Sequence, residues 1–127
     1  EAAALVGESE ITEDREMPAL AQKLLTMMAP GAWVLVKGGH LSGNDVLDLL
    51  TNGQETHVLT TVRTQTKNTH GTGCTLSSAL ATLLPQSETV PEAMQKAKHY
   101  ISKAIAHADE LNVGHGHGPV HHFWEKW

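Results

Sequence analysis

The chain has 127 residues, of which 40% are hydrophobic and 18% are charged, and this suits one domain with an α/β core. Nine Lys and Arg against fourteen Asp and Glu give a net charge of -5 without a basic cluster, which argues against a nucleic-acid surface. No apolar run reaches the roughly 18 residues of a membrane span. The single cysteine excludes an internal disulfide and favours a reducing, cytoplasmic compartment.

The chain begins at Glu1 inside an apparent helix over residues 1–8, which Gly7 is placed to end. Because natural domains rarely begin within an element, we expect a fragment of a longer domain. A second, amphipathic helix is predicted over 13–29, where apolar residues recur at spacings of three and four. Thr12 is a candidate N-cap for this helix.

The run AWVLVK (residues 32–37) lies between glycines and is almost wholly apolar, which predicts a buried parallel strand. Gly38 and Gly39 follow the strand. Ligands of open α/β sheets gather outside the carboxyl ends of strands, so Lys37 is placed to meet a phosphate. A solvated lysine at a strand end is the plainer interpretation of the same residue.

A β-hairpin is predicted over residues 45–62, because Asn52-Gly53 is a strong signal for a hairpin turn. Its mixed polar and apolar faces indicate an edge of the sheet. Two helices are predicted further along the chain. The first extends from about 73 to 84, where Pro85 stops it, and the second extends from 90 to about 111.

The tail GHGHGPVHH (residues 114–122) carries four histidines, which could bind zinc or nickel. Glycine at alternate positions works against such a site, because tight metal sites need a fixed backbone and supporting hydrogen bonds. Phe123, Trp124 and Trp127 instead predict that the tail docks an aromatic patch on the body of the domain.

The only cysteine, Cys74, follows a Gly-Thr-Gly turn at the start of an apolar helix. Helix starts carry unpaired N–H groups and the positive end of the helix dipole, so Gly71, Thr72 and Gly73 form a candidate anion cradle beside a thiol. The P-loop pattern fails because it requires Gly-Lys-Ser/Thr, and the chain has Gly-Cys-Thr at residues 73–75. The dinucleotide pattern fails because Leu76 stands where its third glycine belongs.

Three roles for Cys74 stay open at this point. With His70 as its base, the thiol could be the nucleophile of a hydrolase, although no third orienting group is evident. A thiolate, which a helix start favours, could instead accept the proton of an alcohol. The N–H groups of the 71–74 turn would then hold charge on a moving phosphoryl group. A buried cysteine without chemistry is the third alternative.

The stretch NTHGTGCTLS (residues 68–77) resembles the anion-hole motif of bacterial hydroxymethylpyrimidine/phosphomethylpyrimidine kinases, ribokinase-like enzymes of thiamine biosynthesis. Most ribokinase-like enzymes carry aspartate where this family, like the chain at Cys74, carries cysteine. Two further stretches are similar to the family's phosphate-side turn and to its tail, VKGGHL (36–41) and VGHGHGP (113–119). EAAAL (1–5) resembles the residues that start at the glutamate of the family's Asn-x-x-Glu motif.

The resemblance implies the C-terminal half of a ribokinase-like three-layer αβα sandwich with a β-hairpin at the sheet edge. Residues 1–127 would then be part of a single kinase domain whose N-terminal half is missing. The implied activity is ATP-dependent phosphorylation of 4-amino-5-hydroxymethyl-2-methylpyrimidine and of its monophosphate to the diphosphate. The expected partners are these small molecules, with a homodimer as a candidate state of the full-length protein and neither nucleic acid nor membrane. A pyridoxal kinase and a histidine-rich metal-binding module are the alternatives.

The resemblance also implies roles for individual residues. Cys74 is the expected base of the first phosphorylation, and residues 71–73 are the expected anion hole for the ATP phosphates. Glu1 would act on Mg²⁺, through water, because the glutamate of the family motif organises magnesium and phosphates. Lys37 is a further candidate on the nucleotide side. Without its N-terminal half, the fragment alone is expected to be inactive.

Overall fold

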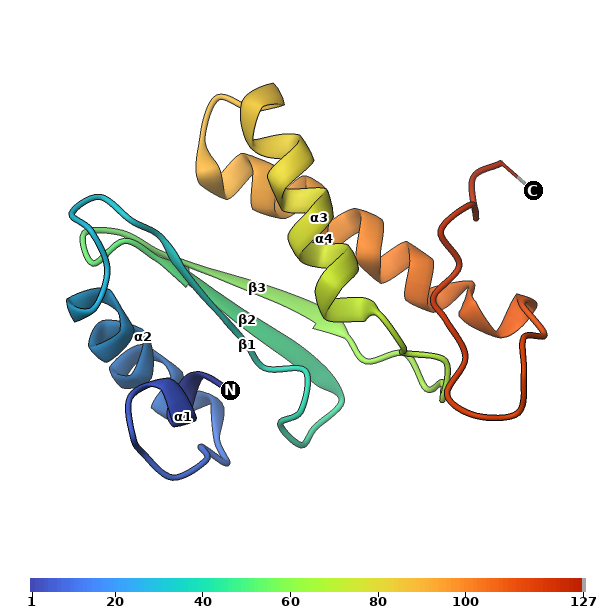
Figure 1. Cartoon of the computed structure of the whole chain (residues 1–127), viewed down its shortest axis with the longest axis horizontal. Helices are drawn as coiled ribbons and strands as arrows, with labels where there is room; N and C mark the ends of the chain where they lie inside the picture. The colour runs from blue at the N-terminus through green and yellow to red at the C-terminus, as the bar shows by residue number, and fades with distance from the viewer. Residues whose placement is uncertain (127) are drawn as a thin grey trace. The chain divides into compact units, whose positions relative to one another are not determined.

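A computed structural model describes residues 1–126 of the chain, which divides into two compact units, Glu1–Arg63 and the segment from Thr64 onward. The first unit contains helix α1 (Ala2–Leu5), the 3₁₀ turn η1 (Asp14–Glu16), helix α2 (Met17–Thr26) and strands β1 (Val34–Lys37), β2 (Asp45–Thr51) and β3 (Thr56–Val62). The second contains α3 (Thr72–Leu83), η2 (Leu84–Gln86), α4 (Val90–Ala106) and η3 (Ala108–Glu110) (Figure 1).

The three strands form an antiparallel sheet in the order β1-β2-β3. β1 and β2 pair with Val34 opposite Thr51, and β2 and β3 pair with Thr51 opposite Thr56. The prediction of a parallel strand over 32–37 is therefore wrong in direction, although the strand itself is present. An apolar run reports that a strand is buried, and it says little about the direction of the neighbouring strand.

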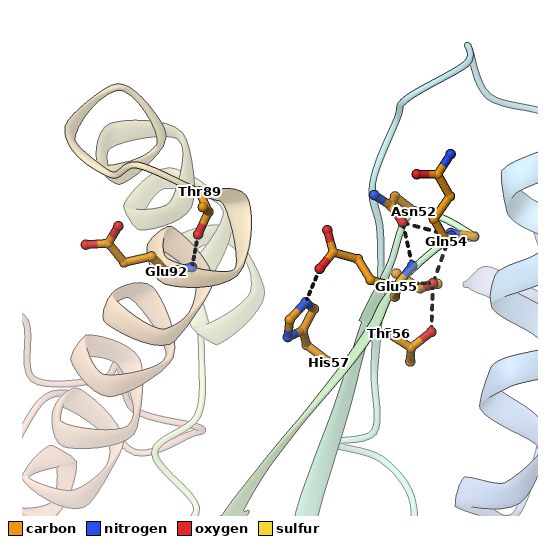
Figure 2. Close-up of polar contacts among 9 residues, drawn as sticks. Asn52, Gln54, Glu55, Thr56, His57, Thr89 and Glu92 are labelled. Carbon is orange, nitrogen blue, oxygen red and sulfur yellow. Dashed lines mark hydrogen bonds and ion pairs between the residues drawn. The ribbon is translucent and has the colours of Figure 1, made fainter.

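The hairpin predicted over 45–62 is confirmed, and β3 forms one edge of the sheet. The Asn52 side-chain oxygen accepts hydrogen bonds from the backbone N–H groups of Gln54 and Glu55, each at 2.9 Å (Figure 2). Gly53 has a φ of 87°, a left-handed conformation that glycine adopts without steric cost. The Asn-Gly signal thus located the turn for a physical reason, because both residues stabilise it locally.

The core of the first unit lies between α2 and the sheet. Its buried cluster consists of Met17, Leu20, Ala21, Val34, Val36 and Leu49. The α2 members recur at spacings of three and four, as one face of a helix requires. Val34 and Val36 are buried while the intervening residue is half-buried, which is the alternation of a strand.

α2 begins at Met17, later than predicted, because the chain first makes the turn η1. The Glu16 carboxylate accepts from the backbone N–H groups of Thr12 at 3.0 Å and Glu13 at 2.9 Å. These two hydrogen bonds, the one from Thr12 above all, lower the pKa of Glu16. Thr12 is therefore a donor to the cap and not the N-cap residue that the sequence predicted.

The two long helices of the second unit, α3 and α4, contact each other along their lengths (Figure 1). α4 starts at the N-cap Thr89, whose hydroxyl oxygen accepts from the Glu92 N–H at 3.3 Å (Figure 2). Both helices lie where the sequence predicted them, but α4 ends at Ala106 and η3 continues the chain. None of the helices in residues 1–126 has the length and apolar character needed to cross a bilayer.

An aromatic contact joins the tail to the rest of the second unit. Trp124 is half-buried and stacks on the His107 ring, with centroids 5.6 Å apart. Phe123 is 59% exposed, and its part in the predicted aromatic docking stays a prediction. Trp127 lies outside the described residues. Within residues 1–126, no three or more His, Cys, Asp or Glu side chains are grouped so that they could hold a metal ion.

The assigned core predicts that a leucine-to-alanine substitution affects the free energy of unfolding differently at a buried and at an exposed position. Leu49→Ala is expected to lower the free energy of unfolding by about 2–5 kcal/mol, because it leaves a cavity beside α2. Leu49 is 3% exposed, whereas Leu5 is 67% exposed, so Leu5→Ala is the matched control with little expected effect. Urea unfolding followed by circular dichroism measures both, and equal losses would contradict the assigned core.

Candidate functional site

The anion cradle predicted from the sequence corresponds to the start of α3. Gly71 is the N-cap residue and has a φ of 81°, a left-handed conformation that favours glycine. Its carbonyl oxygen accepts the N–H of Thr75 at 2.9 Å, which is the first hydrogen bond of the helix. The Thr72 hydroxyl donates to the carbonyl oxygen of Thr69 at 2.7 Å and so links the first residue of the helix to the preceding loop.

The first turn of α3 leaves backbone donors unpaired. In the described part of the chain, no oxygen accepts a hydrogen bond from the N–H of Gly73 or of Cys74. Such groups form the positive end of the helix dipole and can bind an anion. Gly71, Thr72, Gly73 and Cys74 thus form one continuous turn with two free donors. Their role as an anion hole stays a prediction.

Cys74 is the third residue of α3, and its free thiol is exposed. The alternative of a buried cysteine without chemistry is therefore wrong about burial. Among residues 1–126, no hydrogen bond joins the His70 ring to the Cys74 thiol, so the structure does not form the nucleophile–base pair that a cysteine hydrolase uses. His70 is instead held through its backbone N–H, which donates to the carbonyl oxygen of Gly118 at 3.1 Å.

A surface groove of about 670 Å³ begins at Cys74 and follows α3 and α4. Its lining consists of Cys74, Thr75, Ser78, Ala79, Thr82, Leu83, Lys96, Tyr100 and His122. The Lys96 ammonium lies 2.7 Å from a Glu92 carboxylate oxygen. This contact with Lys96, followed by the hydrogen bond from the Glu88 N–H, lowers the pKa of Glu92. Lys96 is thus paired with Glu92, and the groove also carries the exposed thiol of Cys74.

Lys37 lies in the first unit, exposed at the last position of β1 and opposite Asp48 in the register. The next residue, Gly38, donates its N–H to the buried Asp48 carboxylate at 3.1 Å. A Cβ at Gly38 would lie 2.2 Å from the carbonyl oxygen of Leu47, so this position accepts only glycine. The backbone that carries Lys37 is therefore closely fixed against β2, while its side chain stays free for an anion.

Arg63 is a residue of this region that sequence reasoning misses. Its guanidinium donates to the carbonyl oxygens of Gly39 at 2.8 Å, Leu41 at 2.6 Å and Gly43 at 2.8 Å. One side chain thereby holds the loop that follows Lys37. No motif spacing reports these contacts, because they join residues that are far apart in the sequence.

Glu1 also lies in the first unit, exposed at the N-cap of α1. None of the residues up to 126 forms an ion pair with its carboxylate. Proteins commonly bind Mg²⁺ through one or two carboxylates, with water and substrate phosphates completing the shell. One unpaired, exposed carboxylate fits this pattern, and the magnesium role of Glu1 stays a prediction.

The sequence is similar to those of known kinases along its whole length. Residues 1–121 match the family model described as phosphomethylpyrimidine kinase. The hydroxymethylpyrimidine/phosphomethylpyrimidine kinase of Escherichia coli (strain K12) is 47% identical over 127 residues, which are 100% of this chain and 47% of that protein. The thiamine biosynthesis bifunctional protein of Geobacter sulfurreducens is 44% identical over 122 residues, 96% of this chain and 24% of that protein. The chain spans about half the length of curated relatives such as the E. coli kinase.

Solved structures of kinases are similar in fold. The pyridoxal kinase from Staphylococcus aureus in complex with AMP-PCP and pyridoxal has a TM-score of 0.88 and 28% identity, covering 98% of this chain and 45% of that chain. The ADP complex of Bacillus subtilis pyridoxal kinase has a TM-score of 0.87 and 30% identity, covering 98% and 47%. Pyridoxal kinases have the ribokinase-like fold, so the predicted α/β fold class is confirmed.

The left-handed N-cap predicts a penalty for any side chain at Gly71. Gly71→Ala is expected to destabilise the second unit by about 1–2 kcal/mol, because a Cβ is strained in this conformation. Gly116→Ala is the matched control, since a Cβ there meets nothing within 4 Å and its φ is not left-handed. Urea midpoints from circular dichroism compare the two, and identical midpoints would rule out strain at the N-cap.

Proposed function

The chain belongs to the phosphomethylpyrimidine kinase family, and we therefore propose that the protein carrying it transfers the γ-phosphoryl group of ATP to 4-amino-5-hydroxymethyl-2-methylpyrimidine. The monophosphate is then phosphorylated to the diphosphate for thiamine biosynthesis. The observation that carries the proposal is the exposed Cys74 thiol on the first turn of α3, beside two free N–H groups. ADP and AMP-PCP in the structurally similar pyridoxal kinases support ATP as the donor.

In the first phosphorylation, the Cys74 thiolate accepts the proton of the hydroxymethyl group. The hydroxymethyl oxygen forms a bond to the γ-phosphorus while the bond from that phosphorus to the ADP oxygen breaks, and ADP leaves with the electron pair. Negative charge spreads over the transferring group during this step. The N–H groups of Gly73 and Cys74 stabilise it, because they are already oriented by the helix start.

The second phosphorylation places a different demand on Cys74. Its acceptor is a phosphate oxygen, which is already ionised at neutral pH. No hydroxyl proton has to be removed, so the reaction needs the base less. The anion cradle is needed in both steps, because a phosphoryl group is transferred in both. This difference between the two acceptors separates the role of the thiol from that of the backbone donors.

Two residues of the first unit complete the proposal. Mg²⁺ neutralises charge on the ATP phosphates when bound, and Glu1 would hold it through water. Lys37 would contact the nucleotide phosphates, which its exposure and the fixed backbone at Gly38 support. We also propose that residues 1–127 belong to a single kinase domain of the full-length protein.

The proposed partners are the pyrimidine, its phosphate and ATP. A cytoplasmic location is proposed because the single cysteine is a free thiol, as is usual in a reducing compartment. A homodimer of the full-length protein stays a prediction.

A pyridoxal kinase is the second candidate, and the structural similarity to pyridoxal kinases favours it. Two observations favour the pyrimidine kinase over it. The pyridoxal kinases are 28% and 30% identical to the chain, whereas the E. coli pyrimidine kinase is 47% identical. The chain also carries cysteine at position 74, which its resemblance to the pyrimidine kinases implies for that family, where most ribokinase-like enzymes are expected to carry aspartate. Rates with pyridoxal and with hydroxymethylpyrimidine, measured on the same full-length protein, decide between the two.

Removal of the thiol should affect the two steps unequally. In the full-length protein, Cys74→Ala is expected to slow the first phosphorylation by about 10²–10⁴-fold, the usual contribution of a general base. The second phosphorylation should slow less. Met27→Ala removes another sulfur-containing side chain, 61% exposed and outside both the groove lining and the cradle, so it is the control and should leave both rates unchanged. Product formation from each acceptor measures these rates, and an unchanged first step in Cys74→Ala would remove the thiol from the chemistry.

The 127-residue chain by itself is expected to show no kinase activity, because it covers 47% of the E. coli relative, and the resemblance to the family implies that most of the pyrimidine pocket lies in the other half. Purified chain would be incubated with ATP, Mg²⁺ and hydroxymethylpyrimidine, and phosphorylated product would be quantified. The full-length protein under the same conditions is the positive control. Product formed by the chain alone at a rate near that of the full-length protein would contradict the prediction.

A further inference from the structure

The histidine- and glycine-rich tail lies alongside the loop that leads into α3. His70 and Pro119 form a parallel β-bridge. The backbone N–H of His70 donates to the carbonyl oxygen of Gly118 at 3.1 Å. Gly71, the left-handed N-cap of the anion cradle, is the very next residue. The tail therefore contacts the chain immediately before the turn on which the proposed chemistry depends.

Asn68 connects three segments of the second unit through one buried amide. Its side chain belongs to a residue that is 8% exposed, and its Oδ1 accepts the N–H of Gly118 at 3.0 Å. Its Nδ2 donates to the carboxylate of Asp109 at 2.8 Å and to the carbonyl oxygen of Ala108 at 3.4 Å. The loop before α3, the tail and the turn η3 are thus joined at a single side chain. Leaving such a buried amide unpaired is unfavourable, so the three segments are held in one arrangement.

Gly118 has no room for a side chain because of this contact. A Cβ there would lie 2.4 Å from Oδ1 and 2.8 Å from Cγ of Asn68. The other two glycines of the tail motif differ, since a Cβ at Gly114 or at Gly116 meets nothing within 4 Å. Of these three glycines, Gly118 is the one that the packing itself requires.

Two further contacts support the same loop. The Thr66 hydroxyl donates to the Asp109 carboxylate and accepts the backbone N–H of Asn68, the latter at 3.0 Å. The His117 ring nitrogen Nδ1 donates to the carbonyl oxygen of Lys67 at 3.0 Å. At least one histidine of the motif therefore hydrogen-bonds to the backbone of this loop.

We propose that the tail is a clamp on loop 66–70 and that Asn68 and Gly118 are positioning residues for phosphoryl transfer. This inference rests on the proposed function. The N–H groups of Gly73 and Cys74 can meet the reacting group only if the loop before them is fixed. A displacement of about 1 Å in a reacting arrangement costs about 10²-fold in rate, so a clamp one residue from the N-cap acts directly on the rate.

The clamp is tested first by amide hydrogen exchange in the 127-residue chain. Asn68→Ala is expected to accelerate exchange at Thr72 and Thr75, whose N–H groups bond within the turn, and to leave the amides of α4 unchanged. Asn112→Ala is the matched control, because it makes the same substitution at an exposed side chain. Unchanged exchange at Thr72 and Thr75, or equal acceleration throughout α3 and α4, would overturn the proposal.

Exchanging the hydrogen-bond donor and acceptor between positions 68 and 109 distinguishes an effect on the position of the loop from an effect on overall stability. N68D alone sets two carboxylates against each other at positions 68 and 109. In N68D/D109N, the carboxylate at 68 can accept from both the Gly118 N–H and the amide at 109, so these two hydrogen bonds form again, while the longer bond to the Ala108 carbonyl oxygen is lost. Exchange in the turn should rise in N68D and return most of the way to the wild-type rate in the double variant. A double variant as perturbed as N68D would contradict the clamp.

The kinetic arm uses the full-length protein, at a temperature where every variant is folded. N68A is expected to lower kcat of the first phosphorylation by about 10²-fold, as for a misplaced reacting group, with KM for the pyrimidine unchanged. N68D/D109N should recover kcat. A change in KM alone, or unchanged kcat in N68A, would overturn the positioning role. If wild-type full-length protein lacks pyrimidine kinase activity, the proposed function fails, whereas the exchange experiments still decide the clamp.

Discussion

The left-handed backbone at Gly71 is the constraint on which the candidate site depends. Because the chain turns there with a φ of 81°, α3 begins at once, and nothing within residues 1–126 accepts a hydrogen bond from the N–H groups of Gly73 and Cys74. The same turn places the Cys74 thiol in solvent on the first turn of the helix. The candidate anion site and the candidate proton acceptor are therefore adjacent in the chain. Their closeness follows from covalent geometry and helix dipole, and needs no distant packing to create it.

The local conformation of the turn at Gly71 does not fix its position within the second unit. Contacts with the tail fix that position. The amide of Asn68 and the absence of a side chain at Gly118 fit each other closely, and they join the loop to η3 and to the tail. In the first unit, Arg63 does the same for the loop behind Lys37, through three carbonyl oxygens. In each unit, one polar side chain links a loop of the candidate site to a distant part of the sequence: Arg63 does so from outside its loop, and Asn68 from within its loop.

Sequence reasoning succeeded where structure depends on neighbouring residues. The Asn52-Gly53 turn and the Gly-Thr-Gly-Cys start of α3 are local, and both form at the predicted positions. It failed for the direction of β1, because an apolar run reports burial and not pairing. It also gave no role to Asn68, whose partner Gly118 is 50 residues away. Helix and strand periodicities relate only residues that are close in the sequence, so they do not predict this pair. A glycine at position 118 suggests that a side chain would not fit there, but it does not reveal which residue would clash with one.

The central claim is that the start of α3 carries phosphoryl transfer, with Cys74 as the proton acceptor. A crystal structure of the full-length protein with hydroxymethylpyrimidine and a non-hydrolysable ATP analogue tests it most directly. We expect the hydroxymethyl oxygen within hydrogen-bond distance of the Cys74 sulfur, and the γ-phosphate accepting from the N–H groups of Gly73 and Cys74. A γ-phosphate bound away from this turn, or a hydroxymethyl group facing a different base, would contradict the claim.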